Sequence, residues 1–128
     1  MFKAIQTSVS GLIASSVRLN AAASNIANSQ VKSTPNVLTF SAGYTPVRVE
    51  QSTTGGGGVR ATVVPVSPAS LSIFDPTSPL ANSQGAVNIP NISLPAEIAE
   101  LNRASQAYKA NARVLKTLDD TFRTLLKI

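Results

Sequence analysis

The sequence contains neither cysteine nor histidine. Without cysteine there is no disulfide framework and no thiol chemistry. Without histidine the commonest general base is missing, hydroxyl nucleophiles lack their usual activator, and a frequent metal ligand is absent. We therefore expect no catalytic residue, no metal site and no cofactor, and we predict that the chain is not an enzyme.

Charged residues are also scarce, at 13% of the chain against a usual value of about 25%. Among the six acids, Glu97 and Glu100 lie one turn apart on a predicted helix, with no third ligand near them in sequence. Acids on a solvated helix face explain this pair more simply, although a small enzyme that uses both carboxylates is a rival hypothesis. Uncharged polar groups cost less to bury than charges, so this surface favours packing against other chains.

The net charge is +5, which makes nucleic acid the first partner to consider. Most basic residues are scattered, and only Lys109, Arg113 and Lys116 line up at helical spacing. Such a row is typical of a solvated helix face or of a complement to the helix dipole. Because aromatic stacking groups and a recognition motif are missing, we expect no nucleic-acid partner.

Long apolar runs are absent as well. The strongest apolar stretch near the N-terminus, residues 11–14, is shorter than the ~7–15 residues of a signal-peptide core. No stretch approaches the ~20 residues of a membrane-spanning helix. We expect no direct membrane span, and we expect any export to proceed without a cleaved signal peptide.

What the sequence does contain is a long helical stripe at each end. Its apolar or small residues are spaced alternately by three and four, which is typical of helices that pack against other helices. The N-terminal stripe comprises Phe2, Ile5, Val9, Leu12, Ser16, Leu19, Ala23 and Ile26. The C-terminal stripe comprises Leu94, Ile98, Leu101, Ser105, Tyr108, Ala112 and Leu115, and after a gap of seven residues Phe122 and Leu126 continue it. We predict helices over residues 2–28 and from 93–95 to about 127, and we expect Tyr108 to anchor a core.

The other face of the first helix is small and nearly uncharged. It holds Ser8, Ser15, Ala21, Ala22, Asn25 and Asn28. A lone surface helix normally carries a charged outer face, so this composition favours burial on several sides. Asn25, Asn28 and Asn111 can either cap their own helices or bridge to a neighbouring subunit, and the sequence leaves both possibilities open.

Between the helices the sequence is rich in proline and glycine. Alternating residues over 44–50 and 59–64 predict a β-hairpin, with the glycines 55–58 forming a mobile tip. We expect residues 65–93 to be extended with turns. The predicted fold is mainly α with a small β part. Residues 1–34 and 91–128 pair as a coiled coil in one helical axial domain, and 35–90 form a central β-hairpin and an extended Pro-rich linker.

Three passages resemble the flagellar rod and hook axial protein family. Residues 18–28, RLNAAASNIAN, resemble its N-terminal motif, and 105–111, SQAYKAN, resemble its C-terminal motif. Residues 75–81, DPTSPLA, with 85–87 and 90–92, are similar to the proximal-rod subtype. The likeness spans nearly the whole chain.

The resemblance implies a structural subunit of the proximal rod of the bacterial flagellar basal body. Such a subunit is a homo-oligomer in a helical, tubular drive shaft, contacts other rod proteins, crosses the periplasm and is exported by the type III apparatus. Packing between subunits is expected at Phe2, Ile5, Val9, Leu12, Leu19, Ile26, Leu101, Tyr108, Leu115 and Phe122. The alternative is a secreted helical adaptor or binding module of a type III export system.

Overall fold

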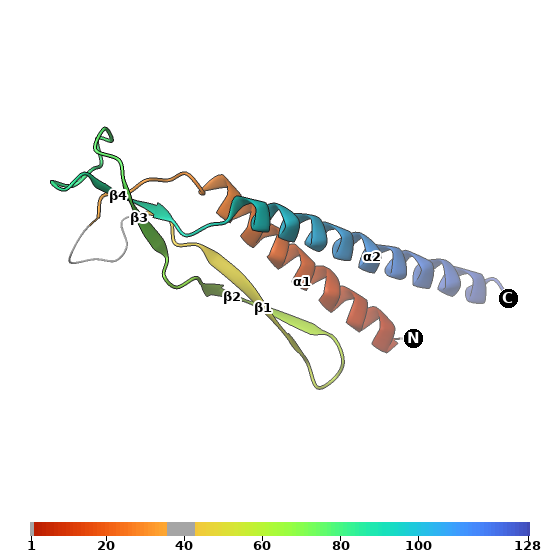
Figure 1. The fold of residues 1–128 in the computed structure, drawn as a ribbon. Helices are drawn as coiled ribbons and strands as arrows, with labels where there is room; N and C mark the ends of the chain where they lie inside the picture. The colour runs from red at the N-terminus through yellow and green to blue at the C-terminus, as the bar shows by residue number, and fades with distance from the viewer. Residues whose placement is uncertain (1, 36–42) are drawn as a thin grey trace.

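The computed structural model describes residues 2–35 and 43–128, so the first part of the predicted central segment, 36–42, lies outside the described residues. Two long helices, α1 (Phe2–Ala27) and α2 (Leu94–Leu126), run antiparallel and side by side. Both chain ends lie at the same end of this pair (Figure 1). At about 1.5 Å per residue the helices are roughly 39 and 50 Å long. The predicted pair of terminal helices is confirmed.

A β-hairpin lies along α1, with its tip directed toward the start of that helix (Figure 1). It consists of β1 (Val47–Thr53) and β2 (Val59–Pro65), paired antiparallel from Val47↔Pro65 to Thr53↔Val59. Alternate residues of β1 such as Val47 and Val49 are half-buried while Arg48 and Glu50 are exposed. This alternation is what the sequence predicted for the hairpin.

A second hairpin, β3 (Ser70–Phe74) with β4 (Ala86–Pro90), was not predicted. It lies at the end of the molecule opposite the two chain ends (Figure 1). Ser33, just beyond α1, pairs with Asn88 through two backbone hydrogen bonds of 2.9 Å and ties this hairpin to the helices. The segment is extended with turns, as expected, but the pairing of its two strands was not predicted; Pro90 closes its strand instead of interrupting it.

The core of the single chain is thin. Among residues 2–35 and 43–128 no Leu, Ile or Phe is buried, and the buried apolar residues are Ala14, Ala21, Ala22, Pro46, Val87, Pro90 and Ala104. Tyr108 is 42% exposed, so the expectation that it anchors a core is wrong for the single chain. Because small side chains bury little apolar area, the free energy that favours folding of an isolated chain is correspondingly small.

Candidate assembly face

One line of residues on α1 faces α2. Gly11, Arg18 and Asn25 are seven residues apart and therefore share a side of the helix. A Cβ atom at Gly11 would lie 2.7 Å from Nδ2 of Asn111 on α2. Arg18 forms an ion pair with Glu100, and the Asn25 amide donates to Glu97 at 3.0 Å. These contacts define the side on which α1 and α2 meet.

The residues that come one position before Gly11 and Asn25 on α1, Ser10 and Ser24, face the β1–β2 hairpin. The Ser10 hydroxyl oxygen accepts a hydrogen bond of 3.1 Å from the backbone N–H of Val59. The Ser24 hydroxyl lies 2.9 Å from the Tyr44 hydroxyl, which leads into β1. One residue corresponds to about 100° around a helix, so the hairpin occupies a second side of α1.

The residues that come one position after the α2-facing line belong to the apolar stripe of α1: Leu12, Leu19 and Ile26. These residues are displaced by about 100° from the α2-facing line, in the direction away from the hairpin. On α2 the apolar stripe likewise follows the α1-facing residues, with Ala112 one residue after Asn111. Two antiparallel helices are related by a two-fold axis perpendicular to the plane that contains them. Because each stripe is rotated in the same sense from the line that faces the other helix, both stripes point toward the same side of that plane. We call this composite surface the seam face.

The ten residues that the sequence predicted for packing between subunits define the seam face: Phe2, Ile5, Val9, Leu12, Leu19, Ile26, Leu101, Tyr108, Leu115 and Phe122. None of them is buried in the single chain. Phe2 is 83% exposed, Val9 40% and Tyr108 42%, and the other seven are half-buried. Leu12 and the residues at heptad spacing from it lie about 100° from the α2-facing line, and Phe2 and Val9 lie farther round α1, on the side away from α2. Side chains of this size and exposure form a surface suited to contact with another chain.

The small, nearly uncharged face of α1 is buried by other parts of the same chain. Of its six members, Ser8, Ser15, Ala21, Ala22 and Asn25 are buried and Asn28 is half-buried. The prediction of burial on several sides is confirmed, because α2 and the hairpin both cover this face. Small residues let these elements approach closely.

Asn25 is a polar hub between α1, α2 and β1. Its Nδ2 donates to the carbonyl oxygen of Val47 at 2.7 Å and to Oε1 of Glu97 at 3.0 Å. Its Oδ1 accepts from the backbone N–H of Val47 at 3.1 Å and from the Tyr44 hydroxyl at 2.9 Å. A side-chain amide has two donor hydrogens and two acceptor sites, so the hydrogen-bonding capacity of Asn25 is used within the chain.

The other two predicted amides lie at less buried positions. Nδ2 of Asn28 donates to the carbonyl oxygen of Ser24 at 2.8 Å, and Nδ2 of Asn111 donates to that of Ala107 at 3.0 Å. Both bonds reach four residues back, from Asn28 just beyond α1 to the last turn of that helix and from Asn111 to its own helix. Asn111 also lies directly against Gly11.

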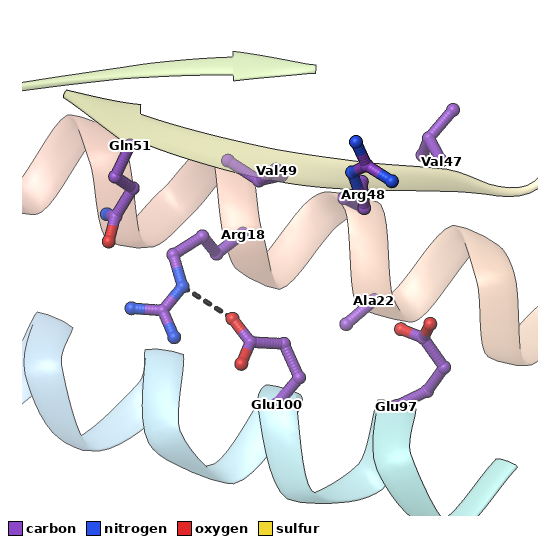
Figure 2. A pocket seen from close by; sticks show the side chains of 9 residues that line it. Arg18, Ala22, Val47, Arg48, Val49, Gln51, Glu97 and Glu100 are labelled. Carbon is purple, nitrogen blue, oxygen red and sulfur yellow. Dashed lines mark hydrogen bonds and ion pairs between the residues drawn. The ribbon is translucent and has the colours of Figure 1, made fainter. Parts of the chain in front are cut away.

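A cleft of about 340 Å³ lies beside the hub, between β1 and α2 over the alanines of α1 (Figure 2). Figure 2 shows Arg18 and Glu100 pointing toward each other across it, and Arg103 approaches the other oxygen of Glu100 at 3.1 Å. The hydrogen bond from Arg18 lowers the pKa of Glu100 below its ordinary value. Burial raises the pKa of Glu97, although its hydrogen bond from Asn25 acts in the opposite direction.

The glycine tip of the β1–β2 hairpin makes specific contacts with α1. Gly57 and Gly58 have φ of +85° and +117°, a region that favours glycine. A Cβ atom at Gly58 would lie 2.7 Å from Oγ of Ser10, whereas one at Gly55 or Gly56 would meet nothing within 4 Å. Gly57 and Gly58 therefore lie against α1, whereas the mobility predicted for the tip stays a prediction.

Sequence reasoning missed Gly11, Ser10 and the pairing of Arg18 with Glu100. The signal for Gly11 and Arg18 was their seven-residue spacing from Asn25. The signal for Ser10 was weaker, because a serine within a helix usually only bonds to its own backbone, as Ser10 also does to Thr7.

Glu97 and Glu100 contact Asn25 and Arg18, and residues 2–35 and 43–128 contain no cluster of three groups able to hold a metal ion. Neither described helix is long and apolar enough to cross a membrane. A pair of long helices with a small buried face and a large apolar outer face defines a class of protein: a subunit built for helix packing between chains.

Comparison with known proteins shows which family this subunit belongs to. Residues 5–32 match the family model "Flagella basal body rod protein", and 83–128 match "Flagellar basal body rod FlgEFG protein C-terminal". The chain is 35% identical to the flagellar basal-body rod protein FlgC of Salmonella typhimurium, over 85% of this chain and 83% of the relative. It is 26% identical to the FlgC of Borreliella burgdorferi, over 100% of this chain and 97% of the relative. The chain belongs to the FlgC family of flagellar basal-body rod proteins, and it is a structural protein, not an enzyme.

Proposed function

We propose that this chain is a subunit of the proximal rod that assembles, with other copies and with other rod proteins, into a helical tube that transmits motor torque. The seam face is the surface through which neighbouring subunits pack. The single observation that carries this proposal is that both apolar stripes lie outside the chain's own core, with none of the ten predicted packing residues buried. A contact between unlike surfaces of identical subunits produces a ring where its rotation closes and an open helical array where it does not.

The two regions of the chain divide this work. Residues 1–34 and 91–128 form the axial domain that packs into the tube, and 35–90 form the central part that faces outward or bridges subunits. The C-terminal match is to a model named for FlgE, FlgF and FlgG, which supports packing between different rod proteins through a common helix. The subunit lies in the rod across the periplasm and reaches it through the type III export apparatus without signal cleavage.

Substitutions on the seam face test this proposal. Leu12→Asp and Leu115→Asp place a charge where a neighbour should pack, and burial of an unpaired charge is costly. We expect both variants to be exported but absent from purified basal bodies, with motility lost. Motility that survives Leu115→Asp would contradict the proposal.

Val9→Asp and Lys109→Gln separate assembly from folding. Both positions are exposed in the single chain, but only Val9 belongs to the seam face. We expect Val9→Asp to reduce incorporation strongly and Lys109→Gln to leave it unchanged, while the helicity of both purified chains matches the wild type. A discrete complex of fixed stoichiometry, in place of a helical array, would instead identify a binding module.

A further inference from the structure

The apolar stripes of α1 and α2 do not determine how far the two helices are displaced along each other. Both stripes lie outside the interface between the helices, where the buried residues are small, such as Ser15, Ala22 and Ala104. Length does not determine the displacement either. α2 has 33 residues and α1 has 26, so α2 could slide by seven residues, about 10 Å, and still cover nearly all of α1. Such a slide also keeps the same sides of both helices in contact, because seven residues make about two turns.

Two contacts between the helices define the register that the chain adopts. Gly11 of α1 lies against Asn111 of α2, and Asn25 of α1 donates to Glu97 of α2 at 3.0 Å. The two contacts are fourteen residues apart on α1 (11 to 25) and fourteen residues apart on α2 (97 to 111). Equal spacing on both helices is what a straight antiparallel pair in one fixed register requires.

Along this register, large side chains of one helix meet very small residues of the other. Arg18 and Ala104 each lie midway between the two contacts, so they stand opposite each other, and Ala104 has no exposed surface. The Arg18 side chain extends past Ala104 to the ion pair with Glu100, about one turn nearer the start of α2. Gly11 likewise makes room for Asn111, since a Cβ atom on Gly11 would lie 2.7 Å from Nδ2 of Asn111.

A slide of seven residues destroys this match in either direction. In one direction Arg18 would stand opposite Asn111 and lose its carboxylate partner, so that two large side chains compete for one space. In the other direction Gly11 would stand opposite Ala104, which leaves a void between the helices. Asn25 would then lie beyond the first residue of α2 and would lose its contact with that helix.

We propose that Gly11, Arg18 and Asn25 set the register of α1 against α2, and that assembly requires this register although none of the three lies on the seam face. A slide of seven residues carries the apolar stripe of α2 about 10 Å along that of α1. The seam face combines both stripes, so a neighbouring subunit would meet a different surface. Polar groups between packed helices are well suited to this role, because they specify register where apolar contacts do not. The inference rests on the proposed function, since it concerns how the seam face obtains its shape.

The distance between two spin labels measures the register in the purified chain. The chain has no cysteine, so Gln6→Cys and Asn102→Cys, both exposed and outside the seam face, can carry nitroxide labels. Pulsed electron paramagnetic resonance gives their separation, whose component along the helices changes by about 10 Å when α2 slides by seven residues. We expect one narrow distance in the chain with native Gly11. We expect Gly11→Leu, which fills the space of Asn111, to shift or broaden it, and Asn20→Leu on the exposed side of α1 to leave it unchanged.

A compensating substitution distinguishes the register from a general loss of packing. Asn111→Ala makes room on α2 for the larger side chain, so Gly11→Leu combined with Asn111→Ala should regain the native distance. In cells we expect incorporation into basal bodies to fall about tenfold for Gly11→Leu and to return to near the native level for the combined variant. Normal incorporation of a chain whose label distance has shifted would overturn the proposal.

Arg18→Ala keeps the proposal testable if Gly11→Leu does not fold, because it removes the ion pair without adding bulk. We expect a broadened label distance with unchanged helicity by circular dichroism. An unchanged distance in Arg18→Ala would overturn the proposal and would assign the register to the backbone bonds between Ser33 and Asn88. Failure of the proposed function would look different, because the label distances would follow these expectations while Leu115→Asp was still incorporated.

Discussion

The side chain of Asn25 pairs with the backbone of Val47 as a neighbouring strand would, donating to its carbonyl at 2.7 Å and accepting from its N–H at 3.1 Å. This one residue of α1 therefore fixes where β1 begins. Through Glu97 the same amide also reaches α2. The relative placement of the two helices and the hairpin depends on a buried polar group in a molecule with few buried apolar ones.

Replacement of Asn25 by alanine should lower the unfolding free energy of the chain more than the loss of so small a side chain suggests. Asn25→Ala removes the side-chain partner of Val47 N–H and Val47 C=O, whereas the Tyr44 hydroxyl keeps its contact with Ser24. Buried groups left without a partner cost about 1–3 kcal/mol in unfolding free energy, and we expect a loss of about 2–3 kcal/mol. Urea denaturation followed by circular dichroism measures it.

Asn28→Ala is the matched control, because Asn28 is half-buried and makes one hydrogen bond to the last turn of α1. We expect a change within about 0.5 kcal/mol. Equal losses for Asn25→Ala and Asn28→Ala would show that the hub has no special role.

The glycines of the hairpin tip should differ sharply in their tolerance of alanine. Gly58→Ala places a Cβ atom 2.7 Å from Oγ of Ser10 and forces a residue with φ near +117° into a strained backbone. We expect a loss of about 1–3 kcal/mol for Gly58→Ala and less than about 0.5 kcal/mol for Gly55→Ala, which has open space. Thermal unfolding of the two purified variants compares them.

Ser10→Ala distinguishes the two causes of the Gly58 effect. Combined with Gly58→Ala it removes the oxygen that the new Cβ atom would meet but leaves the backbone strain. We expect the double variant to recover part of the loss. Tolerance of Gly58→Ala equal to that of Gly55→Ala would mean that the tip does not contact α1.

The stability of the chain should depend on pH through Glu100. Arg18 holds the pKa of Glu100 below its ordinary value of 4.5 in the folded chain. Such a carboxylate stabilises the fold above pH 4.5, and this contribution is lost as the pH falls through the lower, folded pKa. Because the pair is partly exposed, we expect the contribution to be about 1 kcal/mol or less. Unfolding of the wild type and of Glu100→Gln at pH 7 and pH 3 measures it, and the variant should lose less stability on acidification.

The contribution of Glu97 to folding stability should change with pH in the direction opposite to that of Glu100. Burial raises its pKa in the folded chain, so its titration favours folding below pH 4.5 and that contribution is lost as the pH rises through the raised value. Glu97→Gln keeps an oxygen that can accept from Asn25 and removes the charge. We expect this variant to be as stable as the wild type at pH 7, or slightly more stable. A large loss of stability for Glu97→Gln at pH 7 would contradict this assignment.

The sequence was sufficient to predict the helices and strands whose signals lie in neighbouring residues. The three-and-four spacing predicted α1 and α2 to within a few residues, and alternation around the glycines predicted β1 and β2. The β3–β4 hairpin was missed because its partners are five residues long and are joined by the 75–85 turn, so nothing local pairs Ser70–Phe74 with Ala86–Pro90.

The site was predictable in part. The small face of α1 correctly suggested burial, since small uncharged residues have no reason to cover a solvated surface. The role of Asn25 could not be read from the sequence, because its partners Val47 and Glu97 are 22 and 72 residues away. The same is true of Gly58, whose need for glycine arises only where the tip meets Ser10.

The central claim is that the chain completes its core only in an assembly, because the seam face carries large apolar side chains that the single chain leaves unburied. Amide hydrogen exchange of α1 and α2, in the dilute purified chain and in isolated rods, tests this claim most directly. We predict that protection of both helices in the dilute chain is limited by its modest unfolding free energy and that protection is much stronger in the rod. Full protection of both helices in a dilute, monomeric chain would contradict it.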